Sequence, residues 1–182
     1  DDTEDSDDTE DTEDTDNNDN VEPGLNEMVI EQMVEGELIE RRYFLDLPQD
    51  YDGSGSTPVL FAFHGAGGSG ENFIGAFTPS VQAGEIIGVY PDGLENSWNI
   101  EREESKADDT EFTELILEVL ETIPGIDTSK PIATGFSNGA ALIHKISIKT
   151  EIFSGIAPQV SQLLESNQPV SDSANVSVMQ FS

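Results

Sequence analysis

The sequence lacks cysteine altogether, so it forms no disulfide bond and offers no thiolate ligand to a metal. Basic residues are scarce, since 7 Lys and Arg stand against 38 Asp and Glu and give a formal net charge of -31. Nucleic-acid binding needs Lys and Arg to neutralise phosphates, and anionic lipid attracts basic segments. We therefore expect neither nucleic acid nor an anionic lipid surface as a partner. No apolar run approaches the ~20 residues that cross a bilayer, so no membrane span is expected.

The acidic residues are concentrated at the start of the chain. Residues 1–20 hold 12 acidic side chains and no basic one, while the remainder has 26 acidic and 7 basic residues. A tract without apolar side chains cannot offset the entropy lost on ordering. We therefore expect a disordered acidic linker over residues 1–22 and one folded domain over residues 23–182. Alternating Asp also resembles the ligands of a calcium loop, but the EF-hand spacing is absent.

The acidic tract also bears on where the protein acts. Such spacers often follow the signal or lipoprotein leader of an exported protein. We therefore expect an extracellular, secreted protein, with a lipid anchor on a removed leader as an alternative. The acidic composition favours solubility and salt tolerance, as in a marine or saline setting.

Beyond the tract, runs of β-forming residues alternate with helical patterns. Asp108 and Asp109 are interpreted as a pair at a helix N-terminus, because apolar residues follow them at spacings of three, four and seven. This alternation predicts an α/β fold in which helices cover a mostly parallel sheet on both faces. The predicted elements are a hairpin over 28–47, strands at 59–63, 86–90, 131–136, 152–157 and 176–181, and helices at 71–83, 108–123 and after residue 137.

One stretch, residues 131–144, combines three signals in order. A short apolar strand runs into Gly135-Phe136-Ser137-Asn138-Gly139, which fits G-x-S-x-G, and small and apolar residues suited to a helix follow. The flanking glycines leave room for the chain to turn back, because they have no Cβ. A serine on such a strand-to-helix turn is exposed at the edge of the sheet. Ser137 is therefore the candidate nucleophile, with a plain surface turn as the alternative.

A glycine-rich loop follows the apolar strand at residues 59–63. It reads His64-Gly65-Ala66-Gly67-Gly68-Ser69-Gly70. The spacing fits G-x-G-x-x-G, but a phosphate loop would need a lysine, and a dinucleotide site would need an acid at the end of the next strand. The other interpretation is an oxyanion loop after the third strand of a hydrolase. We favour this second interpretation because G-x-S-x-G lies downstream.

With both motifs placed, the chain resembles an α/β-hydrolase. More narrowly, it resembles the secreted polyhydroxybutyrate depolymerases and the feruloyl and acetylxylan esterases. The resemblance covers residues 28–182 and implies a three-layer sandwich with a mostly parallel sheet, incomplete at the C-terminus. The segments that carry it, in chain order, are residues 42–48, His64-Gly65, residues 89–93, Trp98-Asn99, Asp108-Asp109, Ile126-Asp127 and residues 135–139.

The resemblance also implies how the site works. Ser137 would attack an ester carbonyl, with a histidine as general base and an aspartate as its partner. The oxyanion donors would be the backbone N–H groups of Asn138 and Ala66. Trp98 would line the pocket for the acyl or sugar group, or else anchor its loop. No metal and no cofactor is implied.

The sequence departs from this pattern in its acid and base. In the fold the nucleophile is followed by the acid and then by the histidine, yet His64 and His144 are the only histidines. We expect His64 to anchor the oxyanion loop, and His144 to be a packed or surface residue about 10 Å along the helix from Ser137. Asp172, in a predicted loop over residues 167–174, is not assigned to the triad. We therefore expect a C-terminally truncated hydrolase.

The sequence leaves two functions open. The first is a serine carboxylic ester hydrolase that acts on a polyester such as polyhydroxybutyrate or on an ester-substituted polysaccharide. The second is a non-catalytic chain, either a truncated fragment or an acidic binding module that lacks the triad Asp and His. The intact G-x-S-x-G motif favours the first, and the missing distal histidine favours the second.

Overall fold

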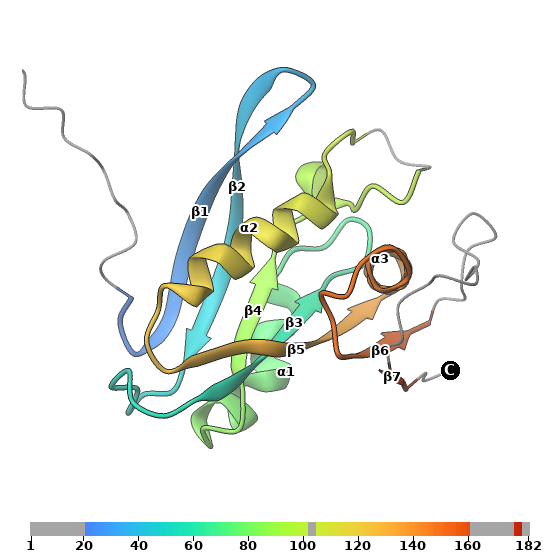
Figure 1. Cartoon of the computed structure of the whole chain (residues 1–182). Helices are drawn as coiled ribbons and strands as arrows, with labels where there is room; N and C mark the ends of the chain where they lie inside the picture. Colours follow the sequence, from blue (N-terminus) through green and yellow to red (C-terminus); the bar gives the residue numbers. More distant parts are fainter. Residues whose placement is uncertain (1–20, 102–104, 161–176, 180–182) are drawn as a thin grey trace, which may run out of the picture.

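A single mixed sheet organises the part of the chain that the structure describes. The computed structural model describes residues 21–101, 105–160 and 177–179. Its seven strands lie in the order β1-β2-β4-β3-β5-β6-β7 (Figure 1). The pairs from β4 to β7 are parallel, whereas β1–β2 and β2–β4 are antiparallel. The strands are β1 (Gly24–Val34), β2 (Glu37–Leu47), β3 (Thr57–Phe63), β4 (Ile87–Pro91), β5 (Ile126–Phe136), β6 (Gly155–Gln159) and β7 (Ser177–Val178).

Helices cover both faces of the sheet. They are α1 (Glu71–Gln82), α2 (Asp109–Glu121) and α3 (Asn138–Lys149), with a short 3₁₀ turn, η1, at Leu94–Asn96. Figure 1 shows α2 and α3 on one face and α1 behind the sheet. The predicted three-layer α/β architecture is confirmed. None of the described helices is long and apolar enough to cross a membrane.

The core follows from the alternation of side chains along the strands. On β3, Phe61 and Phe63 point to the α2 and α3 face, where they join the larger core cluster. Ala62 points to the opposite face and packs with Phe44 and Tyr90 beneath α1. A strand buried on both faces reads as one continuous apolar run, as residues 59–63 do.

The N-terminal hairpin forms as predicted, although β1 begins at Gly24 and not at residue 28. Val34 pairs with Glu37, so the connecting loop is the two residues Glu35 and Gly36. Both have positive φ, 51° and 90°, which is the backbone of a tight hairpin turn. Asp108 accepts hydrogen bonds from the N–H groups of Thr110 and Glu111, so it caps α2.

Several strands differ from their predicted limits, and β5 and β6 show why. The strand predicted at 152–157 begins instead at Gly155. Phe153 turns into the core and packs against Phe61. Pairing with β5 starts only at Ser154, whose N–H donates to Pro131 O (2.9 Å). Strand β5 begins at Ile126, earlier than predicted, since residues 126–127 also pair with β3 before a register shift. Residues 1–20, the predicted loop at 167–174 with Asp172, and half of the predicted strand at 176–181 lie outside the described residues.

Candidate active site

Ser137 sits on the sharp turn between β5 and α3. Its backbone has φ 52° and ψ -110°, outside both the helical and the extended regions. The N–H of Ser137 donates to Gln159 O on β6 (3.0 Å), and its carbonyl accepts from Ala141 in the first turn of α3 (3.1 Å). The residue itself is exposed. A strained, exposed serine at a helix N-terminus has the geometry of a nucleophile elbow.

The two glycines of the motif make this turn possible by close approach rather than by positive φ. A Cβ on Gly135 would lie 2.5 Å from Gly139 O. A Cβ on Gly139 would lie 2.2 Å from Phe63 O, at the end of β3. Both distances are far inside van der Waals contact, so any side chain at either position displaces backbone. The elbow therefore depends on glycine at both places.

The glycine loop after β3 lies against the elbow. A Cβ on Gly65 would come within 3.0 Å of the Phe136 ring, so Phe136 and the loop are in close contact beside Ser137. Gly68 N–H closes a turn onto Gly65 O (3.0 Å), and Gly67 N–H donates to Asn96 O (2.8 Å). Ala66 is exposed in this turn. The loop proposed for the oxyanion and the proposed nucleophile therefore lie next to each other.

Asp92 holds the far end of the glycine loop. Its Oδ1 accepts a hydrogen bond from Gly70 N–H (2.6 Å). Its Oδ2 lies 2.7 Å from the Arg42 guanidinium, and this hydrogen bond raises the pKa of Arg42. The sequence gives no sign of this role, because Arg42 is 50 residues away from Asp92 and no local pattern joins them. The pair ties the loop to the N-terminal hairpin.

The side chain of Asn138 clamps the loop after β4. Its Oδ1 accepts from Trp98 N–H (2.7 Å), and its Nδ2 donates to Trp98 O (3.1 Å). This two-way bond fixes the first residue of α3, whose backbone N–H is a candidate oxyanion donor. An amide side chain can both donate and accept in this way. Asn138 thus has a positioning role that the motif alone does not reveal.

Trp98 is placed as a loop anchor. Its side chain is fully buried. Its indole N–H donates to His64 O (2.8 Å), and its ring meets the Phe63 ring edge-on at 5.2 Å between centroids. A buried ring cannot line an open pocket, so the placement matches the anchor alternative and not the pocket-lining role.

His64 is neutral and structural. Gly93 N–H donates to its Nε2 (2.9 Å), so the proton is on Nδ1, which donates to Gly65 O (2.8 Å). Burial lowers the pKa of His64, against the opposing effect of the Gly65 carbonyl. Both ring nitrogens are engaged in the loop. His64 therefore supports the loop and does not serve Ser137 as a base.

His144 lies two helical turns beyond Ser137 on α3 and is buried. Its Nε2 has no hydrogen-bond partner within the described structure, and burial lowers its pKa. Since α3 rises about 1.5 Å per residue, the ring lies about 10 Å along the axis from Ser137. Neither histidine of the sequence is thus placed as general base. In the same part of the chain, no cluster of three or more His, Asp or Glu is arranged to hold a metal.

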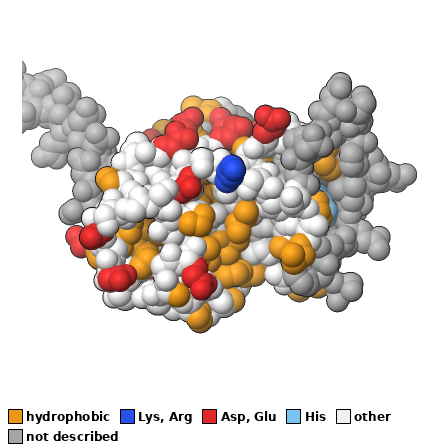
Figure 2. Space-filling view, turned by 60° about the horizontal axis from the view of Figure 1, so that its bottom comes forward, with side chains coloured by type: hydrophobic (Ala, Val, Ile, Leu, Met, Phe, Trp, Pro, Cys, Tyr) orange, Lys and Arg blue, Asp and Glu red, His pale blue; other side chains and the backbone are white. Residues whose placement is uncertain are grey.

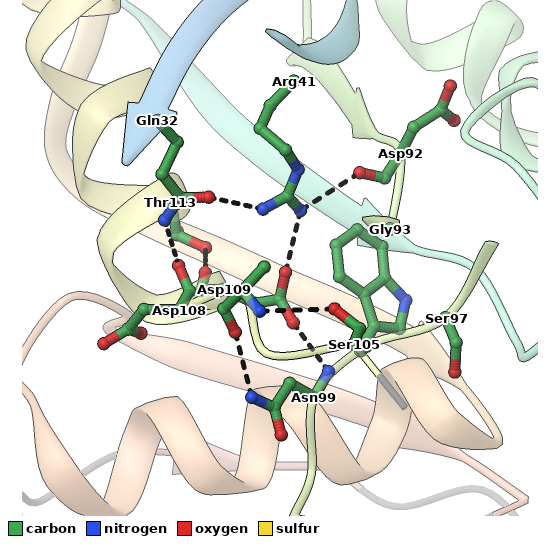
Figure 3. Close-up of polar contacts among 12 residues, drawn as sticks. Gln32, Arg41, Asp92, Gly93, Ser97, Asn99, Ser105, Asp108, Asp109 and Thr113 are labelled. Carbon is green, nitrogen blue, oxygen red and sulfur yellow. Dashed lines mark hydrogen bonds and ion pairs between the residues drawn. The ribbon is translucent and has the colours of Figure 1, made fainter. Parts of the chain in front are cut away.

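A buried ion pair contacts the loop after β4, which contains Trp98 and Asn99. Arg41 Nη2 is 2.8 Å from Asp109 Oδ1, and both side chains are almost fully buried (Figure 3). Asp109 Oδ2 accepts from Asn99 N–H (2.7 Å), and Arg41 Nη1 donates to Gln32 Oε1 (2.5 Å). Burial raises the pKa of Asp109, and the Arg41 guanidinium counteracts it. Asp109 thus joins the hairpin and α2 to the loop that Asn138 clamps.

Comparison with known proteins agrees with this geometry. No family model matches the chain. A protein of Aspergillus terreus named "Probable feruloyl esterase C" is 30% identical over 114 residues, which are 59% of this chain and 41% of the relative. A protein of Aspergillus niger with the same name is 28% identical over 114 residues, with the same coverage. The chain therefore spans about two fifths (41%) of the length of the curated relatives that it matches.

Solved structures share the fold at low identity. The acetyl xylan esterase from Aspergillus awamori superposes with a TM-score of 0.57 at 14% identity, over 79% of this chain and 56% of that one. The fold is therefore that of the α/β-hydrolases, and the chain is similar in sequence to feruloyl esterases.

Proposed function

We propose that this chain is part of a serine carboxylic ester hydrolase in which Ser137 is the nucleophile. The observation that carries the proposal is the backbone of Ser137, strained at φ 52° and exposed at the start of α3. Such strain persists only where the surroundings enforce it, and it is concentrated at functional sites. Here the bond from Ser137 N–H to Gln159 O holds the turn, and the missing Cβ atoms of Gly135 and Gly139 leave room for it. The similarity to feruloyl esterases points to the same chemistry.

The reaction would proceed in two steps at Ser137. Its Oγ attacks the ester carbonyl carbon, its proton passes to a base, and the carbonyl oxygen takes the negative charge. The backbone N–H groups of Asn138 and Ala66 are the proposed donors to that oxygen. Collapse of the intermediate expels the alcohol and leaves an acyl-serine, which water then hydrolyses. Loss of one such donor typically lowers turnover ~10²–10³-fold.

The base is proposed to come from outside the described residues. His64 is bonded through both ring nitrogens, and His144 is buried two turns from Ser137. The curated relatives are more than twice as long as the matched segment, which leaves ample chain for an acid and a histidine. In this proposal the described part supplies the nucleophile, the oxyanion loop and the supports of both.

The proposed substrate is an ester-substituted polysaccharide. The names of the similar proteins, feruloyl esterase C and acetyl xylan esterase, refer to feruloyl and acetyl esters. A polyester such as polyhydroxybutyrate is the competing substrate. The corresponding location is extracellular, which immunodetection in the culture medium of the source organism would test.

A fluorophosphonate probe tests the nucleophile directly. Attack of Ser137 Oγ on phosphorus expels fluoride and leaves a stable phosphonyl-serine. We expect labelling of the longest natural protein that contains this sequence, loss of labelling in Ser137→Ala, and normal labelling in Ser129→Ala, which alters another exposed serine. Absence of labelling, or labelling retained in Ser137→Ala, contradicts the proposal and leaves a non-catalytic chain.

Substrate assays then separate the two ester classes. The same protein is given p-nitrophenyl acetate, methyl ferulate and hydroxybutyrate oligomers, with Ser137→Ala as the blank. Faster hydrolysis of the feruloyl and acetyl esters is expected. Preference for the hydroxybutyrate oligomers would overturn the polysaccharide assignment while leaving the serine mechanism intact.

A further inference from the structure

The loop after β4 contains two neighbouring residues in the left-handed region of the backbone. Glu95 has φ 58° and ψ 31°, and Asn96 has φ 57°. Asparagine is enriched in this region, whereas a glutamate there is strained because its Cβ lies close to the following carbonyl oxygen. Both residues are exposed, so burial of their side chains does not enforce the conformation. Strain of this kind persists only where the surroundings hold it, and the contacts of this loop show what it achieves.

The two left-handed residues form the centre of a tight turn. Ser97 N–H closes the turn onto Leu94 O (3.3 Å). Positive φ at both central residues is what a type I′ turn requires. The carbonyl of Asn96, the second of the pair, accepts a hydrogen bond from Gly67 N–H (2.8 Å). The left-handed backbone thus aims one carbonyl at the glycine loop.

The Asn96 carbonyl meets the glycine loop at its own turn. Gly68 N–H bonds to Gly65 O (3.0 Å), and the two central residues of this turn are Ala66 and Gly67. Gly67 has φ 80°, as the third residue of a type II turn does, and a Cβ there would meet nothing within 4 Å. Type I and type II turns differ by a half-turn of the central peptide. The bond from Gly67 N–H to Asn96 O therefore holds this peptide in one of its two orientations.

The glycine loop is also fixed at both of its ends. Gly93 N–H donates to His64 Nε2 (2.9 Å), which fixes the start of the loop. Gly70 N–H donates to Asp92 Oδ1 (2.6 Å), which fixes its end. Between these anchors, the Asn96 carbonyl reaches the turn itself. The chain after β4 thus supports the start, the turn and the end of the glycine loop.

The charge of the molecule makes the position of each oxyanion donor important. The chain has 38 acidic and 7 basic residues, and on the face in Figure 2 red side chains far outnumber blue ones. The field of such a molecule does not favour a negative charge that develops at the site. Stabilisation of an oxyanion then depends on N–H donors that are held in place beforehand. Ala66, whose N–H is a proposed donor, directly precedes Gly67 in the turn.

We propose that Asn96 is a positioning residue for the oxyanion loop. Its carbonyl holds the peptide that joins Ala66 to Gly67, so the Ala66 N–H keeps one orientation toward the ester oxygen. The role belongs to the backbone of Asn96 and requires a side chain that tolerates positive φ. The inference rests on the proposed function, since it concerns the same reaction at Ser137.

Substitutions that differ in their tolerance of positive φ test this role. The longest natural protein that contains this sequence is assayed with p-nitrophenyl acetate, and Ser137→Ala is the blank. Asn96→Val places a β-branched side chain at φ 57°, where such residues are outliers. We expect kcat to fall about 10–100-fold at unchanged KM, because a displaced donor weakens binding of the transition state and not of the substrate. Asn96→Gly tolerates the angle and should recover most of the turnover.

Amide hydrogen exchange of Gly67 measures the same bond without catalysis. The Gly67 N–H should exchange faster in Asn96→Val than in the natural protein or in Asn96→Gly. The matched control is Glu35→Val, which places valine at φ 51° at the tip of the β1–β2 hairpin (Figure 1). This control should lose thermal stability as Asn96→Val does, yet keep the natural kcat and the natural exchange rate at Gly67.

The outcomes separate the role of Asn96 from the proposed function. An equal loss of kcat in Glu35→Val and Asn96→Val would show that general destabilisation lowers the activity, and would overturn the proposal. An unchanged kcat or an unchanged exchange rate at Gly67 in Asn96→Val would overturn it as well, while Ser137-dependent hydrolysis by the natural protein would leave the proposed function intact. A natural protein no more active than Ser137→Ala would overturn both.

Discussion

Gly139 is one of the residues at which the fold leaves no room for a side chain. Its missing Cβ would lie 2.2 Å from Phe63 O and 2.5 Å from His64 O, both backbone atoms at the end of β3. Gly139→Ala must therefore push α3 away from the sheet, and we expect a loss of about 3 kcal/mol in the free energy of unfolding, as for other overpacked cores. Ser137 moves with the helix, so fluorophosphonate labelling should fall too.

Gly75 provides the matched control on α1. It is exposed, and a Cβ there would meet nothing within 4 Å. Gly75→Ala should raise the free energy of unfolding by up to ~1 kcal/mol, because alanine favours the helix. Urea unfolding of both variants measures the contrast. Equal stability of the two variants would contradict the close approach at the elbow.

The buried His144 is expected to make the stability of the fold depend on pH. Burial lowers its pKa below the usual 6.5, so the folded state binds fewer protons than the unfolded chain just below pH 6.5. Its contribution to stability is therefore complete above pH 6.5 and is lost as the pH falls toward the folded pKa. Relative to His144→Leu, the natural chain should lose melting temperature between pH 7 and pH 5.

The control for this effect is Ser147→Ala on the same helix. Ser147 is also buried, and within the described structure its Oγ has no partner, but it does not titrate in this range. The difference in melting temperature between Ser147→Ala and the natural chain should be independent of pH. A constant difference for His144→Leu across the same range would show that the ring is not kept neutral by burial.

Among the elements, the buried ion pair of Arg41 and Asp109 connects β2 to α2. Both side chains are buried, and the guanidinium also lies 4.0 Å from the centroid of the Phe112 ring. Asp109→Asn leaves a buried positive charge without its partner, so we expect a loss of about 4 kcal/mol in the free energy of unfolding. Arg41→Met/Asp109→Leu should lose much less than the sum of its single variants.

An exposed ion pair provides the control for the loss of stability at the buried pair. Lys149 and Glu101 are 3.5 Å apart and about half exposed, so Glu101→Gln should change stability by less than ~1 kcal/mol. Denaturant unfolding of all variants in one buffer makes the comparison. Additive losses at Arg41 and Asp109 would mean that the two side chains do not act as a pair.

Elements with a strong local pattern could be predicted from the sequence. Helix α2 was predicted from its apolar spacing, and the hairpin from its Glu35-Gly36 turn, because each signal lies within a few residues. The start of β6 was not, since Phe153 is as apolar as a strand residue, and only its contact with Phe61 shows that it belongs to the turn. Strand limits depend on the partner strand, which local composition does not encode.

The candidate site divides in the same way. The Ser137 turn was predicted because its sequence motif lies within five consecutive residues, 135–139. The support by Asp92 and Arg42 was not, since the two residues are 50 positions apart. Asp109 was interpreted only as part of a helix N-terminus, because its partner Arg41 is 68 positions away. The candidate nucleophile is marked by a local motif, whereas the residues that support its surroundings are found only through the fold.

For the whole molecule, charge repulsion is the dominant long-range force. With 38 acidic and 7 basic residues, the folded chain brings together charges that the unfolded chain keeps further apart. Salt screens this repulsion, since the Debye length falls from about 10 Å at 0.1 M to about 3 Å at 1 M. We therefore expect the melting temperature to rise by about 5 °C between 0.02 M and 0.5 M NaCl at pH 7.

The cause of that rise can be separated from general salt effects by pH. Near the sequence pI of about 4.1 the net charge vanishes, so at pH 4.5 the same salt series should change the melting temperature much less. Buried pairs are screened little, so the loss in Asp109→Asn should stay the same across the series, while the small effect of Glu101→Gln should shrink. If the melting temperature rises equally at both pH values, ion exclusion rather than charge repulsion sets the salt dependence, and the acidic surface does not limit stability.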